Sequence, residues 1–468
     1  MTTSNPVPAK PVDHDDTRLL ERLRSRPRRV VLAGWYGEAN LGDEVLLSVL
    51  ARWVEAAGGE PIAISVHPDY TRGAHRIEAV PFVDFAAIVE AVASADLLVL
   101  GGGGLFQDYD PFDRASLQRF PALNVSQYAQ FFYLAEALGV PTAVLAQGVG
   151  PLRGAEGREI VRDVFERAGF VSVRDLESAA LLRDTGVRRE IQVAPDPAWA
   201  WEGEPDAQPS LAARFPQLAG RRVLAMVLRN WPFDPQWENA FVAAFAGLLP
   251  EDWACLWIDF HRIPGSAGAS GIASEIAERM IARLGRAGNH AIWNGSTVDD
   301  AAATLARCDA SVAMRLHGVL LSHRAGLPTV ALEYDGKVRA LGDLLGGADD
   351  LRMPLTGIPS KLRPALRRIT AADRDRSGRV DPARIAQLSR DALDHRALLW
   401  QAMGAAQPLM RRVGSSALSR GLLAGWASAD IDTARRVVAA LSGRLCASRT
   451  VAPASNEATA GTPMESDR

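Results

Sequence analysis

Apolar runs that stop at glycine recur along the first half of the chain. The segments 28–34, 95–104 and 141–151 are each rich in aliphatic residues and end in glycine, whereas 41–58 has helical periodicity. Continuous apolar runs are typical of parallel strands that are buried on both faces. Strands that alternate with helices predict a parallel, doubly wound sheet. We therefore expect residues 28–205 to form a Rossmann-like domain.

A second series of the same kind follows a region rich in proline and glycine at 202–220. Further strands are predicted at 222–230, 253–260 and 290–295, in the first part of 308–318, and at 328–335. This series predicts a second Rossmann-like domain over residues 221–360. Two such domains facing a cleft form a GT-B-like α/β fold, in which ligands bind beyond the carboxyl ends of the strands.

The two ends of the chain have a different character. Residues 1–27 are polar and predicted to be a disordered leader, and 446–468 a disordered tail. Residues 361–445 are predicted to form a helical C-terminal extension, whose first part, up to about residue 400, packs back on the first domain. No apolar run reaches the roughly 18 residues that a membrane span needs, and the N-terminus does not resemble a signal peptide, so a cytoplasmic location is expected.

One segment of the extension has two interpretations. In 411–426, arginines flank apolar residues. A packed amphipathic helix is the favoured interpretation, and a peripheral contact with the membrane surface is the other.

Composition and charge argue against several classes of protein. The net charge is -3, which gives no global basic field for nucleic acid. The three cysteines are far apart in sequence, so neither a disulfide framework nor a zinc site is expected. Of the 52 basic residues only Lys10, Lys337 and Lys361 are lysines, which makes Lys337 stand out in the motif described below.

Three glycine motifs follow predicted strands. In 34–47, a helix begins near Leu41, and Asn40 or Asp43 would cap it beside free N–H groups that favour an anion. In 98–108, Gly102 and Gly103 belong to four consecutive glycines that allow a substrate to approach the main chain. In 146–152, Gln147 is a neutral hydrogen-bond donor. Plain structural turns are the alternative explanation for each motif.

Cationic residues lie at three strand ends. Arg174 follows one strand of the first domain, where an interdomain ion pair is the alternative to ligand binding. Arg315 and His317 lie at a strand-to-helix junction of the second domain, and Lys337 follows its next strand. This set suits a small, highly charged anion. It does not suit a metal, because carboxylates and a second histidine are missing from it.

Taken in order, these motifs resemble the polysaccharide pyruvyl transferase family, specifically its bacterial cell-wall (CsaB-type) branch. The resemblance rests on residues 40–44, 102–108, 147–152, 173–175, 194–198, 315–317 and 334–338. One departure is Pro195, which stands within a segment that is a simpler Ala-Asp-Pro-Ala in the family.

The resemblance implies a GT-B-like fold that binds phosphoenolpyruvate as the donor, held by Arg174, His317 and Lys337 with Arg315 beside them. It also implies pyruvylation of N-acetylmannosamine in a lipid-linked precursor of S-layer-anchoring wall polymers at the inner membrane face. No cofactor is implied. The residue chemistry agrees: His317 is the candidate general acid, because histidine is the side chain that ordinarily exchanges a proton near neutral pH, and Asp43 is a weaker candidate for accepting a hydroxyl proton.

Two rival functions remain at this stage. A nucleotide-sugar glycosyltransferase of the same fold would place a carboxylate after the last strands to hold a ribose diol, and Glu333 is the available residue. A polymer-binding scaffold without enzymatic activity would leave the cationic cluster beside the glycine loops unexplained.

Overall fold

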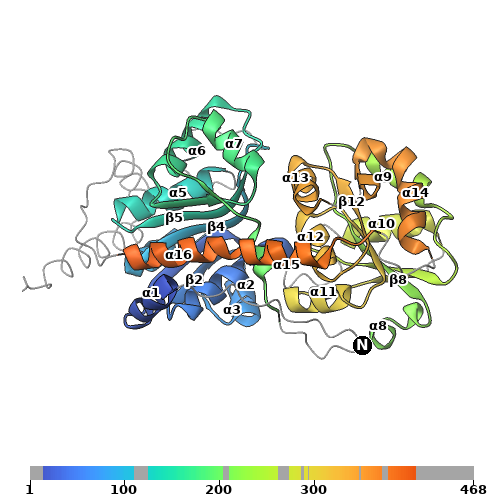
Figure 1. Cartoon of the computed structure of the whole chain (residues 1–468), viewed down its shortest axis with the longest axis horizontal. Coiled ribbons are helices and arrows are strands. Elements are labelled where there is room, and N and C mark those ends of the chain that lie inside the picture. The colour runs from blue at the N-terminus through green and yellow to red at the C-terminus, as the bar shows by residue number, and fades with distance from the viewer. Residues whose placement is uncertain are drawn as a thin grey trace, which may run out of the picture.

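The computed structural model describes residues 14–109, 117, 125–203, 210–261, 274–285, 289–293, 295–346, 349–371 and 378–406. These residues form two α/β domains that lie side by side (Figure 1). Each domain has one parallel sheet with helices on both faces, which confirms the predicted GT-B-like fold class.

The N-terminal sheet has seven strands in the order β3-β2-β1-β4-β5-β6-β7. Strands β1 to β3 extend the sheet in one direction, and β4 to β7 extend it from β1 in the other direction. The switch point therefore lies between β1 and β4. The strands are β1 (Arg29–Tyr36), β2 (Glu60–Ser65), β3 (Glu78–Pro81), β4 (Leu97–Phe106), β5 (Thr142–Val149), β6 (Phe170–Val173) and β7 (Gln192–Val193). Its helices are α2 (Leu41–Ala56), α3 (Pro68–His75), α4 (Phe85–Ser94), α5 (Val125–Ala137), α6 (Ala155–Arg167) and α7 (Leu176–Asp184).

The C-terminal sheet repeats this plan with six strands in the order β10-β9-β8-β11-β12-β13. Its switch point lies between β8 and β11. The strands are β8 (Arg222–Val227), β9 (Trp253–Trp257), β10 (His290–Ile292), β11 (Ala310–Ala313), β12 (Thr329–Glu333) and β13 (Arg352–Pro354). The helices are α9 (Trp237–Phe245), α10 (Ser274–Leu284), α11 (Val298–Leu305), α12 (Leu316–Arg324), α13 (Gly336–Leu345) and α14 (Ile358–Thr370).

One hydrophobic core runs through both domains. It joins α2 residues such as Val45 to α12 residues such as Leu320, and both side chains are fully buried. The backbone N–H of Leu41 donates to the carbonyl of Phe260 across the interface at 2.9 Å. A shared core of this kind fixes how the strand ends of the two domains face each other.

Two expectations about the ends of the chain do not hold. Residues 14–24 of the expected disordered leader form helix α1 (His14–Arg24), which packs against α16. Helix α14 begins before residue 361 and packs on α9 of the C-terminal domain, not on the first domain. The proline- and glycine-rich region 202–220 contains a short helix, α8 (Leu211–Arg214).

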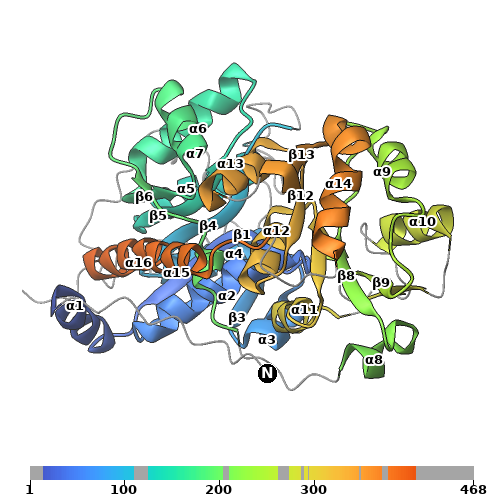
Figure 2. The same ribbon diagram turned by 45° about the vertical axis from the view of Figure 1, so that its right-hand side comes forward.

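The last described helices do return to the first domain. Helix α15 (Pro382–Asp391) leads from the C-terminal domain into α16 (Leu393–Ala405), which lies along α2, β5 and β6 (Figures 1 and 2). The segment 411–426 and the predicted tail 446–468 lie outside the described residues. Among the helices that the structure describes, none is both long and apolar enough to span a bilayer.

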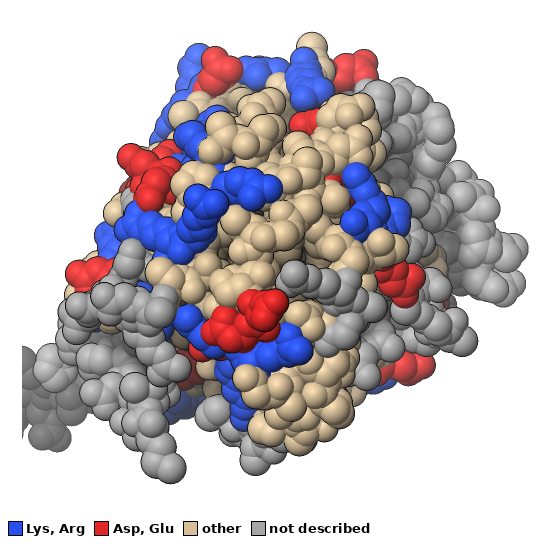
Figure 3. Space-filling view, turned by 90° about the vertical axis from the view of Figure 1, so that its right-hand side faces the viewer, with Lys and Arg blue, Asp and Glu red and all other residues tan. Residues whose placement is uncertain are grey.

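The outer face of the C-terminal domain carries charges of both signs. Figure 3 shows Lys and Arg side chains interspersed there with Asp and Glu and with uncharged surface.

A buried histidine attaches α16 to the N-terminal sheet. His395 Nε2 lies 3.0 Å from the carbonyl oxygen of Ala194, and its Nδ1 lies 2.8 Å from Ser172 Oγ. A carbonyl can only accept, so Nε2 carries the proton and Nδ1 accepts from the Ser172 hydroxyl. Burial lowers the pKa of this ring to about 4, so the ring is neutral at neutral pH and Nδ1 has no proton to donate.

This depressed pKa predicts a pH-dependent stability. The unfolded chain binds a proton at His395 below about pH 6.5 and the folded chain only near pH 4, so stability falls as pH drops between these values. When the pH is lowered from 7.5 to 5, the contribution of His395 should reduce the free energy of unfolding by about 2 kcal/mol. Urea unfolding at both pH values should show a smaller pH difference in His395→Asn than in the wild type. An unchanged difference would contradict the assignment.

Candidate active site

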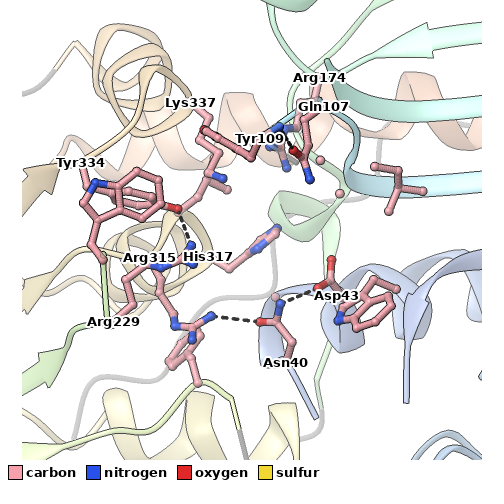
Figure 4. Close-up of a pocket in the computed structure, with 18 of the residues that line it drawn as sticks. Asn40, Asp43, Gln107, Tyr109, Arg174, Arg229, Arg315, His317, Tyr334 and Lys337 are labelled. Atoms are coloured by element: carbon pink, nitrogen blue, oxygen red, sulfur yellow. Dashed lines mark hydrogen bonds between the residues drawn. The ribbon is translucent and has the colours of Figure 1, made fainter. Parts of the chain in front are cut away.

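A cleft of about 460 Å³ opens between the two domains (Figure 4). Its walls come from the segments that follow β1, β4, β8, β11 and β12. These segments include both switch points, where open α/β sheets bind their ligands. The cleft is thus the place where the topology predicts a site.

Three helices begin at this cleft. They are α2 after β1, α12 after β11 and α13 after β12, and residues of each first turn line the cavity. A helix N-terminus has unpaired N–H groups and a partial positive charge. Three such ends around one cavity favour an anionic ligand.

Four predicted cations line the same cavity. Arg174 comes from the end of β6, Arg315 and His317 from the junction of β11 and α12, and Lys337 from the first turn of α13 (Figure 4). A fifth cation, Arg229 at the end of β8, was not predicted. The cleft therefore gathers positive charge from both domains.

A buried carboxylate joins two of these cations. Asp196 Oδ2 lies 3.0 Å from Arg174 Nη1 and 3.4 Å from His317 Nε2. Burial alone would raise the pKa of Asp196, but His317, Arg174 and the Ala198 amide hold it well below its usual range. Asp196 is thus an anion that contacts one basic side chain from each domain. Asp196 belongs to the motif at 194–198, but the sequence alone indicated no role for this carboxylate.

A polar chain crosses the cleft on the other side of His317. Asn40 Nδ2 donates to Asp43 Oδ2 at 2.5 Å, and Arg315 Nη1 donates to Asn40 Oδ1 at 3.4 Å (Figure 4). Burial raises the pKa of Asp43 to about 6, although His317 opposes this effect. Asp43 can therefore exchange a proton near neutral pH, as a general base must. Asn40 lies at the N-cap of α2, but its side chain makes no capping hydrogen bond.

Lys337 lies at the opposite wall. Its Nζ is 3.5 Å from Asp335 Oδ2 and 5.4 Å from the ring centroid of Tyr334. The Tyr109 hydroxyl donates to Asp335 Oδ2 across the cleft, and Arg229 Nη1 donates to the Tyr334 hydroxyl at 3.0 Å. Lys337 keeps about a third of its side chain exposed, so it can still reach a ligand in the cavity.

Two glycines make room for the cationic side chains. A Cβ on Gly42 would lie 2.3 Å from His317 Nδ1, and a Cβ on Gly148 would lie 2.5 Å from Arg174 Nη2. Real Cβ atoms do not approach other atoms so closely, so any larger residue must displace the ring or the guanidinium. Glycine is needed at these positions to let α2 and β5 pack directly on functional side chains.

This contact predicts that Gly42→Ala lowers activity without unfolding the protein. Alanine favours the helix by up to about 1 kcal/mol, but its methyl group forces His317 out of position, so we expect at least a roughly tenfold lower kcat. Gly73→Ala in α3 is the matched control, since a Cβ there meets nothing within 4 Å. Steady-state kinetics and thermal unfolding of both variants check this, and equal activity in both would contradict it.

Two predicted ligand-binding residues do not line the cleft. Gln147 is fully buried and donates to the carbonyls of Leu100 and Gly102 within the sheet. Gly102 has φ +68°, and a Cβ there would meet Leu46 of α2 at 2.9 Å. Glycine is therefore needed at position 102 so that helix α2 can pack against it. Of the predicted pair only Gly103 lines the cavity, and a Cβ there would lie 3.0 Å from Asp43 Oδ1.

Glu333 is occupied elsewhere. Its Oε1 accepts from Arg352 Nε at 2.8 Å, and it does not line the cleft. It is therefore a poor candidate for holding a ribose diol. Among the residues that the structure describes, no three His, Cys, Asp or Glu side chains are grouped to hold a metal ion.

Solved structures similar to this chain share its architecture. HepE of Anabaena in complex with UDP is 14% identical over 80% of this chain and 98% of its own, with a TM-score of 0.50. A putative UDP-N-acetylglucosamine 2-epimerase of Listeria monocytogenes is 11% identical over 77% and 94%, with a TM-score of 0.51. A glycosyltransferase of Rickettsia africae is 12% identical over 90% and 99%, with a TM-score of 0.47. At such identities the likeness to the first two structures shows the fold alone.

Sequence comparison identifies the family. No curated protein sequence matches this chain significantly. The family described as "Polysaccharide pyruvyl transferase" matches residues 40–336, a range that holds the first turn of α2, the glycine strand β4 and the Arg315–His317 junction. The chain is a member of the polysaccharide pyruvyl transferase family.

Proposed function

We propose that this protein transfers a pyruvyl group from phosphoenolpyruvate to two hydroxyls of a sugar, forming a ketal and releasing phosphate. The observation that carries the proposal is the gathering of Arg174, Arg315, His317 and Lys337 around one interdomain cleft. Family membership supports a transferase that acts on polysaccharide. The charge of the site supports phosphoenolpyruvate as the donor.

Phosphoenolpyruvate carries a carboxylate and a phosphate on a three-carbon skeleton. Guanidinium groups bind such oxygens with paired N–H donors, and an ammonium group adds a point charge. Cations on two domains can therefore hold the two anionic groups at fixed positions while the helix N-termini add N–H donors. A cleft of about 460 Å³ leaves room for a sugar beside this small donor.

His317 is the proposed general acid. It gives a proton to the methylene carbon, and the resulting oxocarbenium-like centre at C2 is attacked by the first sugar hydroxyl, which loses its proton. The C2–O bond to phosphate then breaks, and its electron pair leaves with the phosphate oxygen. Lys337 and Arg315 stabilise the departing charge. The second sugar hydroxyl attacks C2, loses its proton and closes the ketal ring.

Asp43 is the proposed acceptor of a hydroxyl proton. A pKa of about 6 leaves it mostly ionised at neutral pH, yet basic enough to take up a proton transiently. Asn40 holds one carboxylate oxygen, so the other is available to a hydroxyl. The first-turn position of Asp43 puts this base near His317. His317 can therefore protonate the methylene carbon while Asp43 takes the proton of the hydroxyl that attacks the neighbouring C2.

For the acceptor we propose the substrate of the CsaB-type branch, an N-acetylmannosamine residue in a lipid-linked cell-wall precursor at the cytoplasmic face of the membrane. The proposal rests on the ordered motifs of this sequence. The chemistry needs no cofactor, because both the leaving group and the acceptor are provided by the substrates.

A phosphate-release assay tests this function. The purified protein is mixed with phosphoenolpyruvate and an N-acetylmannosaminyl glycoside, and ketal formation is followed by NMR. One phosphate should appear for each ketal. Release of UDP from a UDP-sugar, with no phosphate from phosphoenolpyruvate, would favour a nucleotide-sugar glycosyltransferase instead.

A further inference from the structure

Four aromatic rings form a continuous group at the cleft, which we call the aromatic rim. Its members are Tyr109, Trp231, Phe233 and Tyr334, and all four line the cavity. Trp231 contacts Tyr334 edge to face at a centroid distance of 4.6 Å and Phe233 at 4.9 Å. Phe233 also stacks on Tyr109, with centroids 5.8 Å apart and planes at 27°.

The rim leads from the cationic part of the cleft to solvent. At its inner end Arg229 lies 5.0 Å from the Tyr334 ring centroid and 5.2 Å from that of Trp231. At its outer end Phe233 is 65% exposed. Packing does not require a phenylalanine at such a position, and exposed aromatic surface at a binding cleft commonly marks a contact site.

The rim is held from both domains. Tyr109 follows β4 of the N-terminal domain, whereas the other three rings belong to the C-terminal domain. The Tyr109 hydroxyl donates to Asp335, next to Tyr334, and this hydrogen bond fixes the ring across the cleft. The aromatic surface is therefore preorganised, which lowers the cost of ordering it on binding.

A pyranose ring fits this surface better than the donor does. One face of many pyranoses presents a patch of C–H groups that packs on aromatic rings, while their hydroxyls bond to polar neighbours. Phosphoenolpyruvate is small and doubly anionic, and it belongs with the cations. An acceptor polysaccharide extends beyond the reacting sugar and needs a surface that reaches solvent.

We propose that the aromatic rim binds a sugar ring of the acceptor, with Phe233 and Trp231 against its C–H face, and thereby directs acceptor hydroxyls toward the donor. This assignment rests on the proposed function, because it takes a saccharide to be the second substrate. Phe233 is then a specificity-determining residue that contacts the acceptor and not phosphoenolpyruvate.

Kinetics of Phe233→Ala test the proposal. The acceptor in this assay is methyl N-acetyl-β-mannosaminide. The KM of Phe233→Ala for this acceptor should be about tenfold higher than that of the wild type, the value expected for the loss of one stacking contact. The KM for phosphoenolpyruvate should stay within about twofold of the wild-type value. Phe233→Tyr keeps the flat ring, so it should restore most of the acceptor binding that Phe233→Ala loses. Val83→Ala, which trims a side chain that is 63% exposed and does not line the cleft, is the matched control.

Saturation-transfer NMR with the same glycoside separates this proposal from the proposed function, because it needs no turnover. The pyranose C–H protons should receive saturation from the wild type and from Phe233→Tyr, and at least about fivefold less from Phe233→Ala. If the phosphate-release assay is negative but this saturation pattern is seen, the proposed function is wrong and the assignment of the aromatic rim to a sugar is supported. Equal saturation in all variants, or a response to uridine and not to the glycoside, overturns the rim assignment.

Discussion

His317→Ala is expected to lower kcat by at least about 100-fold while the protein remains folded. The imidazole lies in the cleft between Asp196 and Gly42, and no other histidine among the described residues lines that cavity. Its removal takes away the proposed proton donor to the methylene carbon. Helix α12 loses little, because alanine is a strong helix former. Phosphate release under saturating substrates measures the effect.

The control for this variant is His67→Ala, which removes a partly exposed histidine that does not line the cleft. Its activity should match the wild type. Thermal unfolding of His317→Ala should still be cooperative but at a lower temperature, because the buried Asp196 loses one of its two basic partners. Full activity of a folded His317→Ala would exclude this histidine as the acid.

Asp196→Asn is expected to lower both stability and activity. The substitution keeps an oxygen for the Ala198 amide but removes the negative charge between Arg174 and His317. Breaking a buried charge pair by removing one partner costs about 3 to 5 kcal/mol. The free guanidinium and imidazole also lose their fixed positions, so kcat should fall by roughly 100-fold.

Urea unfolding and phosphate release together check the Asp196 prediction. Asp343→Asn is the control, because its carboxylate is 63% exposed and pairs with Arg352 away from the cleft. The control should change stability by less than about 1 kcal/mol. An Asp196→Asn protein that is as stable and active as the wild type would show that the carboxylate orients neither cation.

The convergence of the cations could be anticipated from the sequence because carboxyl ends of parallel strands share one edge. Arg315, His317 and Lys337 follow neighbouring strands, so topology alone brings them together. Arg229 also ends a strand and was missed. Nearly all basic residues of this chain are arginines, so the sequence does not distinguish a single functional arginine from the many others.

Other features depend on contacts between distant segments. The aromatic rim joins Tyr109 to Phe233 across the two domains, and no local pattern pairs them. A glycine pattern does not say what approaches the backbone: at Gly102 it is Leu46 of α2, whereas Gly103 faces the cavity beside Asp43. The edge strands β3 and β13 have four and three residues, too few to show a periodicity.

Calorimetric titration of the wild type, Arg174→Ala and Lys337→Ala with phosphoenolpyruvate tests the central claim most directly. If cations from both domains hold one donor, the wild type binds phosphoenolpyruvate and each variant binds it at least about tenfold more weakly. Arg339→Ala, which removes an exposed arginine outside the cleft, should bind like the wild type. Binding of phosphoenolpyruvate that is unchanged in both cleft variants, or absent from the wild type while UDP binds, would contradict the account.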